Sequence, residues 1–230
     1  MKKLLVANYK MNGDKNFYEN ANKVLNKLKS EDTIILCPPF VYMPYLKIKN
    51  KALALGSQDV SAMDNKKSTG QISGNMLNEL GVKYSIVGHS ERREIGETDE
   101  IVSKKVCAAQ KNGIVPIVCV GEEKLGANLN VLAEQVELAL KGAINKDIVF
   151  AYEPIWAIGT GEKPTVVNIK KAVKIIKITA KHCGYNVPVL YGGSVNADNY
   201  KEILTANVDG LLMGGVSLKL DEFIKIVKGE

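Results

Sequence analysis

Residues 148–161 read Ile-Val-Phe-Ala-Tyr-Glu-Pro-Ile-Trp-Ala-Ile-Gly-Thr-Gly. The apolar run from Ile148 to Tyr152 is short and uninterrupted, which is typical of a strand buried on both faces of a parallel sheet. It ends at Glu153, and Pro154 then punctuates the strand. A carboxylate at the end of a buried strand is held rigidly and is partly desolvated, which suits a proton-abstracting base. A Glu-Pro pair at a strand end is equally often a simple turn. Other parts of the sequence are therefore needed to distinguish a catalytic base from a turn.

Seven further apolar runs have the same character, and each stops at a polar residue or a glycine: 4–7, 33–37, 52–55, 84–87, 115–120, 187–190 and 210–213. Most of the segments between them carry apolar residues at helical spacing, as in the stripe from Phe17 to Leu28 and the longer pattern from Val166 to Ala180. Eight such alternations in 230 residues predict an α/β fold, a single (β/α)8 barrel, with an open doubly wound sheet as the second possibility. No linker or composition break interrupts residues 1–230, so we expect one domain. His182, just before Gly184, is expected to lie at a helix end, where a capping role suits it.

Composition excludes several classes of function. The net charge of +6 comes from dispersed lysines, with no Lys/Arg run longer than two, which argues against nucleic-acid binding. No apolar run approaches the length of a membrane span, and we expect a cytoplasmic protein. The four cysteines are widely spaced without a CxxC pair, so neither a disulfide framework nor a metal site is expected; they are Cys37, Cys107, Cys119 and Cys183.

In a barrel of this kind, functional residues gather where the strands end. Asn8 and Lys10 follow the first run, His89 follows the fourth, and Glu153 follows the sixth. Glycine-rich turns, whose backbone N–H groups can cradle a phosphate, follow the last two runs at 192–194 and 214–215. Each feature alone is more often structural than functional. Their joint position on one rim indicates a site for an anionic ligand.

Five segments carry a resemblance to a known family, in its order and over essentially the whole chain: 8–12 (Asn-Tyr-Lys-Met-Asn), 88–93 (Gly-His-Ser-Glu-Arg-Arg), 151–161, 191–195 (Tyr-Gly-Gly-Ser-Val) and 214–215 (Gly-Gly). They resemble the signatures of the triosephosphate isomerase family. The resemblance implies a (β/α)8 barrel that interconverts dihydroxyacetone phosphate and D-glyceraldehyde 3-phosphate through an enediolate intermediate, in glycolysis and gluconeogenesis. It also implies that no metal and no organic cofactor is needed, since the proton removed is returned to the adjacent carbon.

The resemblance also implies a role for each matched residue. Glu153 would abstract the carbon-bound proton, and neutral His89 would polarise the carbonyl and move a proton between the two oxygens. Lys10 would stabilise the enediolate and attract the phosphate, with Asn8 orienting the substrate. The phosphate would be held by Gly159, Ser194, Gly214 and Gly215. The segment from Trp156 to Gly161 would form a lid, and Glu91 would support the site.

A homodimer is implied as well, formed through the loop Ser61–Ser73, in which Thr69 would approach Asn8 of the partner subunit. Gln71 replaces a glutamate that in the family usually pairs with the partner's Arg92, so a hydrogen bond would take the place of that ion pair. Tyr9 stands where the family usually has tryptophan. Pro164 restricts the residue before it to extended conformations at the far end of the expected lid.

Two alternatives remain open on the sequence. One is a different phosphate-binding barrel enzyme, which would share the glycine turns after the last two strands. The other is an inert barrel used as a binding protein. The loss of Lys10, His89 or Glu153 would favour either alternative, and all three are present.

Overall fold

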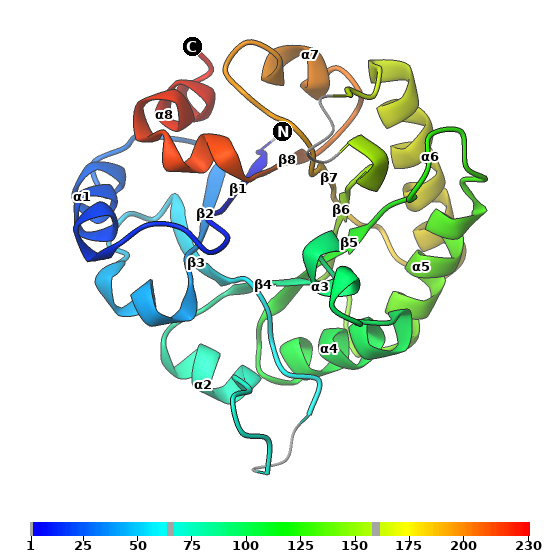
Figure 1. Ribbon diagram of the computed structural model, residues 1–230, viewed down its shortest axis with the longest axis horizontal. Helices are drawn as coiled ribbons and strands as arrows, with labels where there is room; N and C mark the ends of the chain where they lie inside the picture. The colour runs from blue at the N-terminus through cyan, green and yellow to red at the C-terminus, as the bar shows by residue number, and fades with distance from the viewer. Residues whose placement is uncertain (1, 64–66, 158–161) are drawn as a thin grey trace.

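The computed structural model describes residues 2–63, 67–157 and 162–230. Eight parallel strands form a closed barrel in which each strand pairs with its neighbours in chain order (Figure 1). Leu4 of the first strand pairs with Thr33 on one side and with Gly210 of the last strand on the other, which closes the barrel. The strands are β1 (Leu4–Asn8), β2 (Thr33–Cys37), β3 (Leu53–Ser57), β4 (Tyr84–Val87), β5 (Val115–Val120), β6 (Val149–Tyr152), β7 (Val189–Tyr191) and β8 (Gly210–Met213).

Helices follow most of the strands, and the longer helices surround the barrel on its outside (Figure 1). They are α1 (Lys15–Leu25), α2 (Gly74–Glu79), α3 (Ser90–Glu94), α4 (Asp99–Lys111), α5 (Asn130–Lys141), α6 (Val166–His182), α7 (Tyr200–Leu204) and α8 (Leu220–Lys228), with the short 3-10 helices η1 (Phe40–Tyr45), η2 (Ile155–Ala157) and η3 (Gly215–Leu218). The predicted (β/α)8 barrel is therefore confirmed. Between β2 and β3 the chain forms η1 in place of an α-helix, because Pro44 lies inside this segment and cannot donate a backbone hydrogen bond. Among the described residues, no helix has both the length and the apolar character required to cross a membrane.

The predicted strand bounds differ from the observed ones by up to two residues. The run at 52–55 becomes β3 (Leu53–Ser57), because Ser57 still pairs with Ser85 of β4, and its hydroxyl donates to the Ser85 hydroxyl at 2.8 Å. The run at 187–190 becomes β7 (Val189–Tyr191), because Pro188 has no N–H to join the ladder.

Two helix ends show how local sequence sets the bounds. The helix expected to run to Leu28 ends at Leu25, since Asn26 caps it and bonds the 47–50 segment through its side chain. Helix α6 begins after Thr165, whose hydroxyl accepts the Asn168 N–H, and ends at His182 as expected. The C-cap residue is Cys183, whose N–H donates to the Thr179 carbonyl at 3.1 Å, so the capping position expected for His182 is wrong by one residue.

Two layers of apolar side chains make up the core. Alternate strand positions fill the barrel interior, among them Val6, Ile35, Ile117 and Leu212. A larger layer packs between the strands and the helices. This arrangement leaves the ends of the strands as the place where polar side chains can gather.

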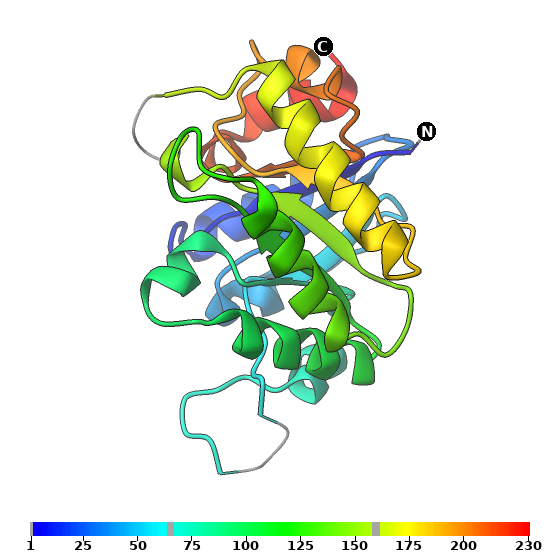
Figure 2. The same ribbon diagram turned by 90° about the vertical axis from the view of Figure 1, so that its right-hand side faces the viewer.

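The connection from β3 to α2 projects beyond the ring of helices. Its described parts, 61–63 and 67–73, extend away from the barrel in both views (Figures 1 and 2). Met63 in this segment is 56% exposed.

Candidate active site

The carboxyl ends of the strands bring the predicted side chains together around one cavity of about 270 Å³. Its walls include seven of the eight predicted site residues: Asn8, Lys10, His89, Glu153, Ser194, Gly214 and Gly215. The eighth, Gly159, lies outside the described residues. The cavity is smaller than the roughly 300–1,000 Å³ typical of sites for drug-sized ligands, which suits a small substrate.

Glu153 follows β6 directly, and its backbone is held by the end of the neighbouring strand β5. Its N–H donates to the Val120 carbonyl at 2.8 Å, and a Cβ at Gly121 would lie 1.7 Å from the Glu153 carbonyl oxygen, so only glycine fits there. The side chain is buried, and the Ser90 N–H donates to its Oε2 at 3.3 Å. Burial raises the pKa of the Glu153 carboxyl, an effect that His89, the Ser90 N–H and other nearby donors offset only in part.

His89 is the N-cap of α3, and its geometry fixes which nitrogen carries the proton. Its Nδ1 accepts the Glu91 N–H at 3.2 Å, so the neutral ring carries its hydrogen on Nε2. Nε2 lies 3.2 Å from Oε1 of Glu153. A neutral imidazole N–H and a carboxylate therefore face each other at the wall of the cavity.

Lys10 adopts a backbone conformation that is uncommon for a residue with a side chain, with φ of 50°. Such conformations persist only where the surroundings enforce them, and they cluster at functional sites. Here the Asn8 Oδ1 accepts the Lys10 N–H at 3.1 Å, and the Gln58 amide donates to the Lys10 carbonyl at 2.8 Å. The Lys10 ammonium lies 2.6 Å from Glu91 Oε1 at the edge of the cavity.

A further wall of the cavity is made by the segments that follow β7 and β8, the latter next to Lys10, whose Cε would lie 3.3 Å from a Cβ at Gly214. Ser194, Gly214 and Gly215 line it, and η3 begins at Gly215. A Cβ added at Gly215 would meet no atom within 4 Å, so the backbone there is open to a ligand. A wall of exposed backbone and a hydroxyl, beside a lysine, is suited to an anion.

The family of the chain follows from its similarity to known proteins. The model of the family "Triosephosphate isomerase" matches residues 3–230. The chain belongs to the triosephosphate isomerase family.

Curated relatives agree with this assignment to the triosephosphate isomerase family. A protein named triosephosphate isomerase from Synechococcus sp. (strain JA-2-3B'a(2-13)) is 43% identical over 207 residues, covering 86% of this chain and 82% of the relative. Proteins of the same name from Nostoc sp. (strain PCC 7120 / SAG 25.82 / UTEX 2576) and from Mycoplasma mobile (strain ATCC 43663 / 163K / NCTC 11711) are 39% and 41% identical, each with 99% of both chains covered. The barrel is accordingly that of an isomerase.

The start of the segment expected to be the family's lid is tied to the barrel by one carboxylate. Oε1 of Glu122 accepts the Tyr152 hydroxyl and the Trp156 indole N–H, each at 2.8 Å. Residues 158–161, the remainder of the expected lid, lie outside the described residues.

Sequence reasoning missed three residues near the site. Gln58 and Glu122 each follow a strand, so the rule that identified Lys10 and Glu153 applies to them equally. Cys119 lies within the apolar run 115–120, where the sequence predicts only a small buried hydrophobe. It is buried, but its thiol also hydrogen-bonds Glu153. No local signal distinguishes this cysteine, because the contact arises from the pairing of β5 with β6.

Metal ligands and cofactors were also considered in the sequence. Within the described residues, no group of three or more His, Cys, Asp or Glu side chains is placed to hold a metal ion. The absence of a cofactor remains a prediction from the family resemblance.

Proposed function

We propose that this barrel interconverts dihydroxyacetone phosphate and D-glyceraldehyde 3-phosphate, with Glu153, His89 and Lys10 as the groups that act on the substrate. The observation that carries the proposal is their convergence: a buried carboxylate, an imidazole N–H and an ammonium line one small cavity at the carboxyl ends of the strands. Family membership supports the same reaction.

In the first step, ionised Glu153 takes a proton from the carbon next to the substrate carbonyl. The electron pair of that C–H bond forms a carbon–carbon double bond, and negative charge moves to the carbonyl oxygen. Such a proton is very weakly acidic, so the base fails unless the developing oxyanion is stabilised. The raised pKa of the Glu153 carboxyl makes it a stronger base than an ordinary glutamate while its neighbours keep it available in ionised form.

His89 and Lys10 are the groups that stabilise the oxyanion. The Nε2 hydrogen of His89 can be donated to the oxygen, and the ring can then take the proton of the neighbouring hydroxyl, so that it is neutral again after the transfer. Glu153 returns its proton to the adjacent carbon, which completes the isomerisation without net change in the enzyme. Lys10 adds a positive charge at the rim, where it stabilises the enediolate and attracts the dianionic substrate.

The phosphate of the substrate would lie against the wall formed by Ser194, Gly214 and Gly215, with Gly159 as a fourth contact and Asn8 orienting the triose. The enediolate can lose its phosphate by elimination, so a closed site has a second purpose besides excluding water. Trp156 begins the segment that would close over it.

We propose further that two copies assemble through the loop Ser61–Ser73, that the enzyme works in the cytoplasm, and that neither membrane nor nucleic acid is a partner. Support for the dimer comes from the projecting loop and its exposed Met63 (Figure 2).

A coupled assay with the purified protein tests the isomerase in both directions. We expect turnover of each triose phosphate at micromolar to millimolar KM and no requirement for an added metal or cofactor. Failure of a correctly folded protein to turn over either substrate would overturn the proposal and favour an inert barrel. Turnover of a different sugar phosphate alone would favour another phosphate-binding barrel enzyme.

A further inference from the structure

A second hollow, of about 980 Å³, lies next to the active site but has its own walls. One wall comes from α3 and the start of α4, and the other comes from the segment that follows β5. Ser90 connects the two sites, because its N–H donates to Glu153 while the residue itself lines the hollow. Small-molecule sites usually have volumes of roughly 300–1,000 Å³, so this hollow is large enough for a small organic ligand.

The charged side chains of this hollow are mostly acidic, although the chain as a whole carries a net charge of +6. Six carboxylates and two cations line it, and their net charge is therefore −4. Only one ion pair joins them in the described part of the chain, between Arg93 and Asp99 at 2.6 Å. The hollow therefore attracts cations. Its charged residues are Glu94, Glu97, Asp99, Glu100, Glu122 and Glu123, with Arg93 and Lys124.

Buried polar atoms without a hydrogen-bond partner are concentrated in these walls. The described residues include four such side-chain atoms, and three of them belong to residues that line the hollow: the Ser90 hydroxyl, Oε2 of Glu97 and Oε2 of Glu122. Buried polar groups are ordinarily satisfied, so a concentration of exceptions indicates a missing partner. Carboxylate and hydroxyl oxygens can all accept, so the partner that they require is a hydrogen-bond donor.

The negative charge of Glu122 has no cation partner within the described ranges of the chain. The residue is only 4% exposed, and its Oε1 accepts two neutral donors, the Tyr152 hydroxyl and the Trp156 indole N–H. Removing a carboxylate from water is unfavourable unless an opposite charge compensates it. A cation bound in the hollow would supply that charge.

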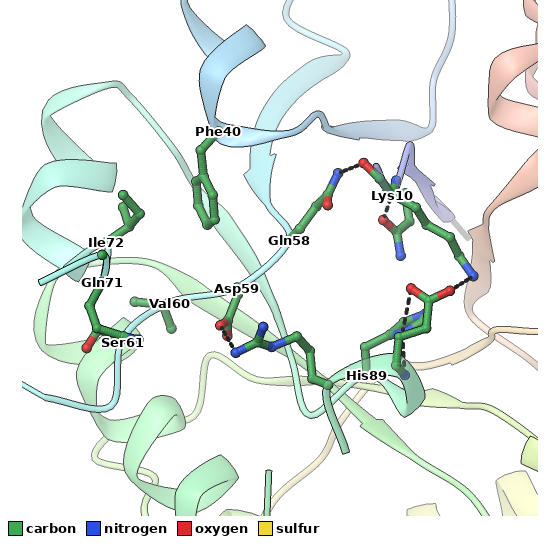
Figure 3. A pocket seen from close by; sticks show the side chains of 13 residues that line it. Lys10, Phe40, Gln58, Asp59, Val60, Ser61, Gln71, Ile72 and His89 are labelled. Atoms are coloured by element: carbon green, nitrogen blue, oxygen red, sulfur yellow. Dashed lines mark hydrogen bonds and ion pairs between the residues drawn. The ribbon is translucent and has the colours of Figure 1, made fainter. Parts of the chain in front are cut away.

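Glu97 shows how such compensation looks when the chain provides it. Its Oε1 accepts the Arg92 Nε–H at 2.7 Å and also pairs with Lys105. Arg92 pairs in turn with Asp59, an interaction that Figure 3 shows. Glu97 therefore lacks only a donor for its second oxygen, whereas Glu122 lacks both a donor and a countercharge.

The walls also indicate which class of cation fits. Among the described residues, no group of three or more His, Cys, Asp or Glu side chains is placed to hold a metal ion. The carboxylates are instead distributed over two walls, and apolar side chains such as Val131 and Ile155 line the same hollow. A linear diamine matches this lining, because it has an ammonium with three N–H donors at each end and a methylene stem that can lie on apolar surface.

We propose that this hollow is a binding site for a linear aliphatic diamine or polyamine. One ammonium lies on the wall of Glu122, and another lies on the wall of Glu94 and Glu100. The site is separate from the isomerase chemistry and does not depend on it. Because Glu122 also holds the indole of Trp156, binding changes the surroundings of that side chain, which is the one tryptophan of the chain.

Isothermal titration calorimetry with putrescine at neutral pH and low salt tests the proposal, with Trp156 fluorescence as the second readout. We expect saturable binding of one putrescine per chain with a Kd of about 0.1–1 mM, and a fluorescence change that follows the same isotherm. Butylamine has the same stem and one charge, and Mg²⁺ has the charge of putrescine without N–H donors or a stem. Each should bind at least about tenfold more weakly than putrescine.

Two double variants locate the bound diamine. Glu94→Gln with Glu100→Gln removes two exposed carboxylates of the hollow and should weaken binding by about fivefold or more. Glu31→Gln with Glu202→Gln removes two exposed carboxylates that do not line it, and should leave the Kd within about twofold. Glu122→Gln removes the buried charge and should weaken binding by about tenfold or more. The exposed double variants decide the question even if Glu122→Gln lowers stability.

Three results would overturn the inference. The absence of saturable heat and of a fluorescence change up to about 10 mM putrescine would show that the hollow binds no diamine. Equal affinity for putrescine and Mg²⁺, or for putrescine and butylamine, would show diffuse attraction of cations. An equal loss of affinity in the two double variants would place the bound diamine elsewhere on the surface. None of these results affects the coupled assay, which tests the isomerase separately.

Discussion

Adding one methyl group at Gly192 should lower catalysis by displacing the base. Gly192 follows β7, and its N–H donates to the Tyr152 carbonyl at 2.8 Å, so its backbone is fixed. A Cβ there would lie 2.9 Å from Cγ of Glu153 and 3.3 Å from Oε1. Carbon atoms in contact are ordinarily about 3.5–4.0 Å apart, so the Glu153 side chain must move by about 0.6–1 Å.

A shift of that size has a calculable consequence. Misplacing a reacting group by about 1 Å can cost roughly 100-fold in rate, which corresponds to about 2.7 kcal/mol in the activation free energy. We expect Gly192→Ala to lower kcat by about 30–100-fold while KM changes by less than about threefold, because the added methyl group faces the base and leaves the phosphate wall in place.

The assay is the coupled interconversion of the two triose phosphates, with the thermal unfolding midpoint measured on the same samples as the control for folding. A variant that keeps the native midpoint and a kcat within threefold of the unsubstituted enzyme would be inconsistent with a loss of rate caused by displacement of Glu153. It would mean that the position of the Glu153 carboxylate does not limit the reaction.

Three further predictions concern the groups around the base and the neighbouring aromatic cluster. The reaction requires ionised Glu153, and burial raises the pKa of its carboxyl. As the pH is lowered, kcat/KM should therefore begin to fall at a pH above 4.5, the ordinary pKa of glutamate. Cys119→Ala removes a donor that favours the ionised carboxylate and should move this acid limb to higher pH, whereas Cys119→Ser keeps a donor and should leave it in place; pH–rate profiles distinguish the two. Lys10→Met should lower kcat/KM by about 100–1,000-fold and weaken its dependence on ionic strength, as measured by steady-state kinetics over a salt series. An unchanged kcat/KM and salt dependence would show that the ammonium is dispensable. Tyr9 and Tyr18 pack edge to face. The Tyr9 hydroxyl is buried and has no hydrogen-bond partner in the described part of the chain. The Tyr18 hydroxyl, in contrast, donates to the Asn12 carbonyl at 2.6 Å. Tyr9→Phe should therefore raise the free energy of unfolding by about 1 kcal/mol and Tyr18→Phe should lower it by a similar amount, as measured by urea unfolding at one protein concentration; equal effects would count against this account.

The features that the sequence predicts well are those with a local signal. Each buried strand is a short apolar run, and the polar residue that ends it, such as Asn8 or Glu153, lies where the barrel topology gathers functional side chains. The short helices α2 and α3 have six and five residues, too few for a helical period to show, so they could not be predicted, whereas Ile203 and Leu204 do indicate α7.

Tertiary pairing accounts for what could not be predicted. Lys105 lies in a helix and resembles a surface lysine in sequence, yet it is buried because Asp59, 46 residues away, pairs with it. The role of Cys119 depends in the same way on a neighbouring strand. Contacts of this kind join residues that are far apart in the sequence, and the spacing of residues along the chain does not predict them.

In the proposed mechanism, Glu153 removes a carbon-bound hydrogen from the substrate. Proton NMR in D2O measures this directly, because each abstraction allows solvent deuterium to replace that hydrogen. For Glu153→Gln, which preserves size and hydrogen-bonding capacity, we predict that both deuterium incorporation and isomerisation fall by at least about 1,000-fold while the protein stays folded. Incorporation within tenfold of that of the unsubstituted enzyme would contradict the account.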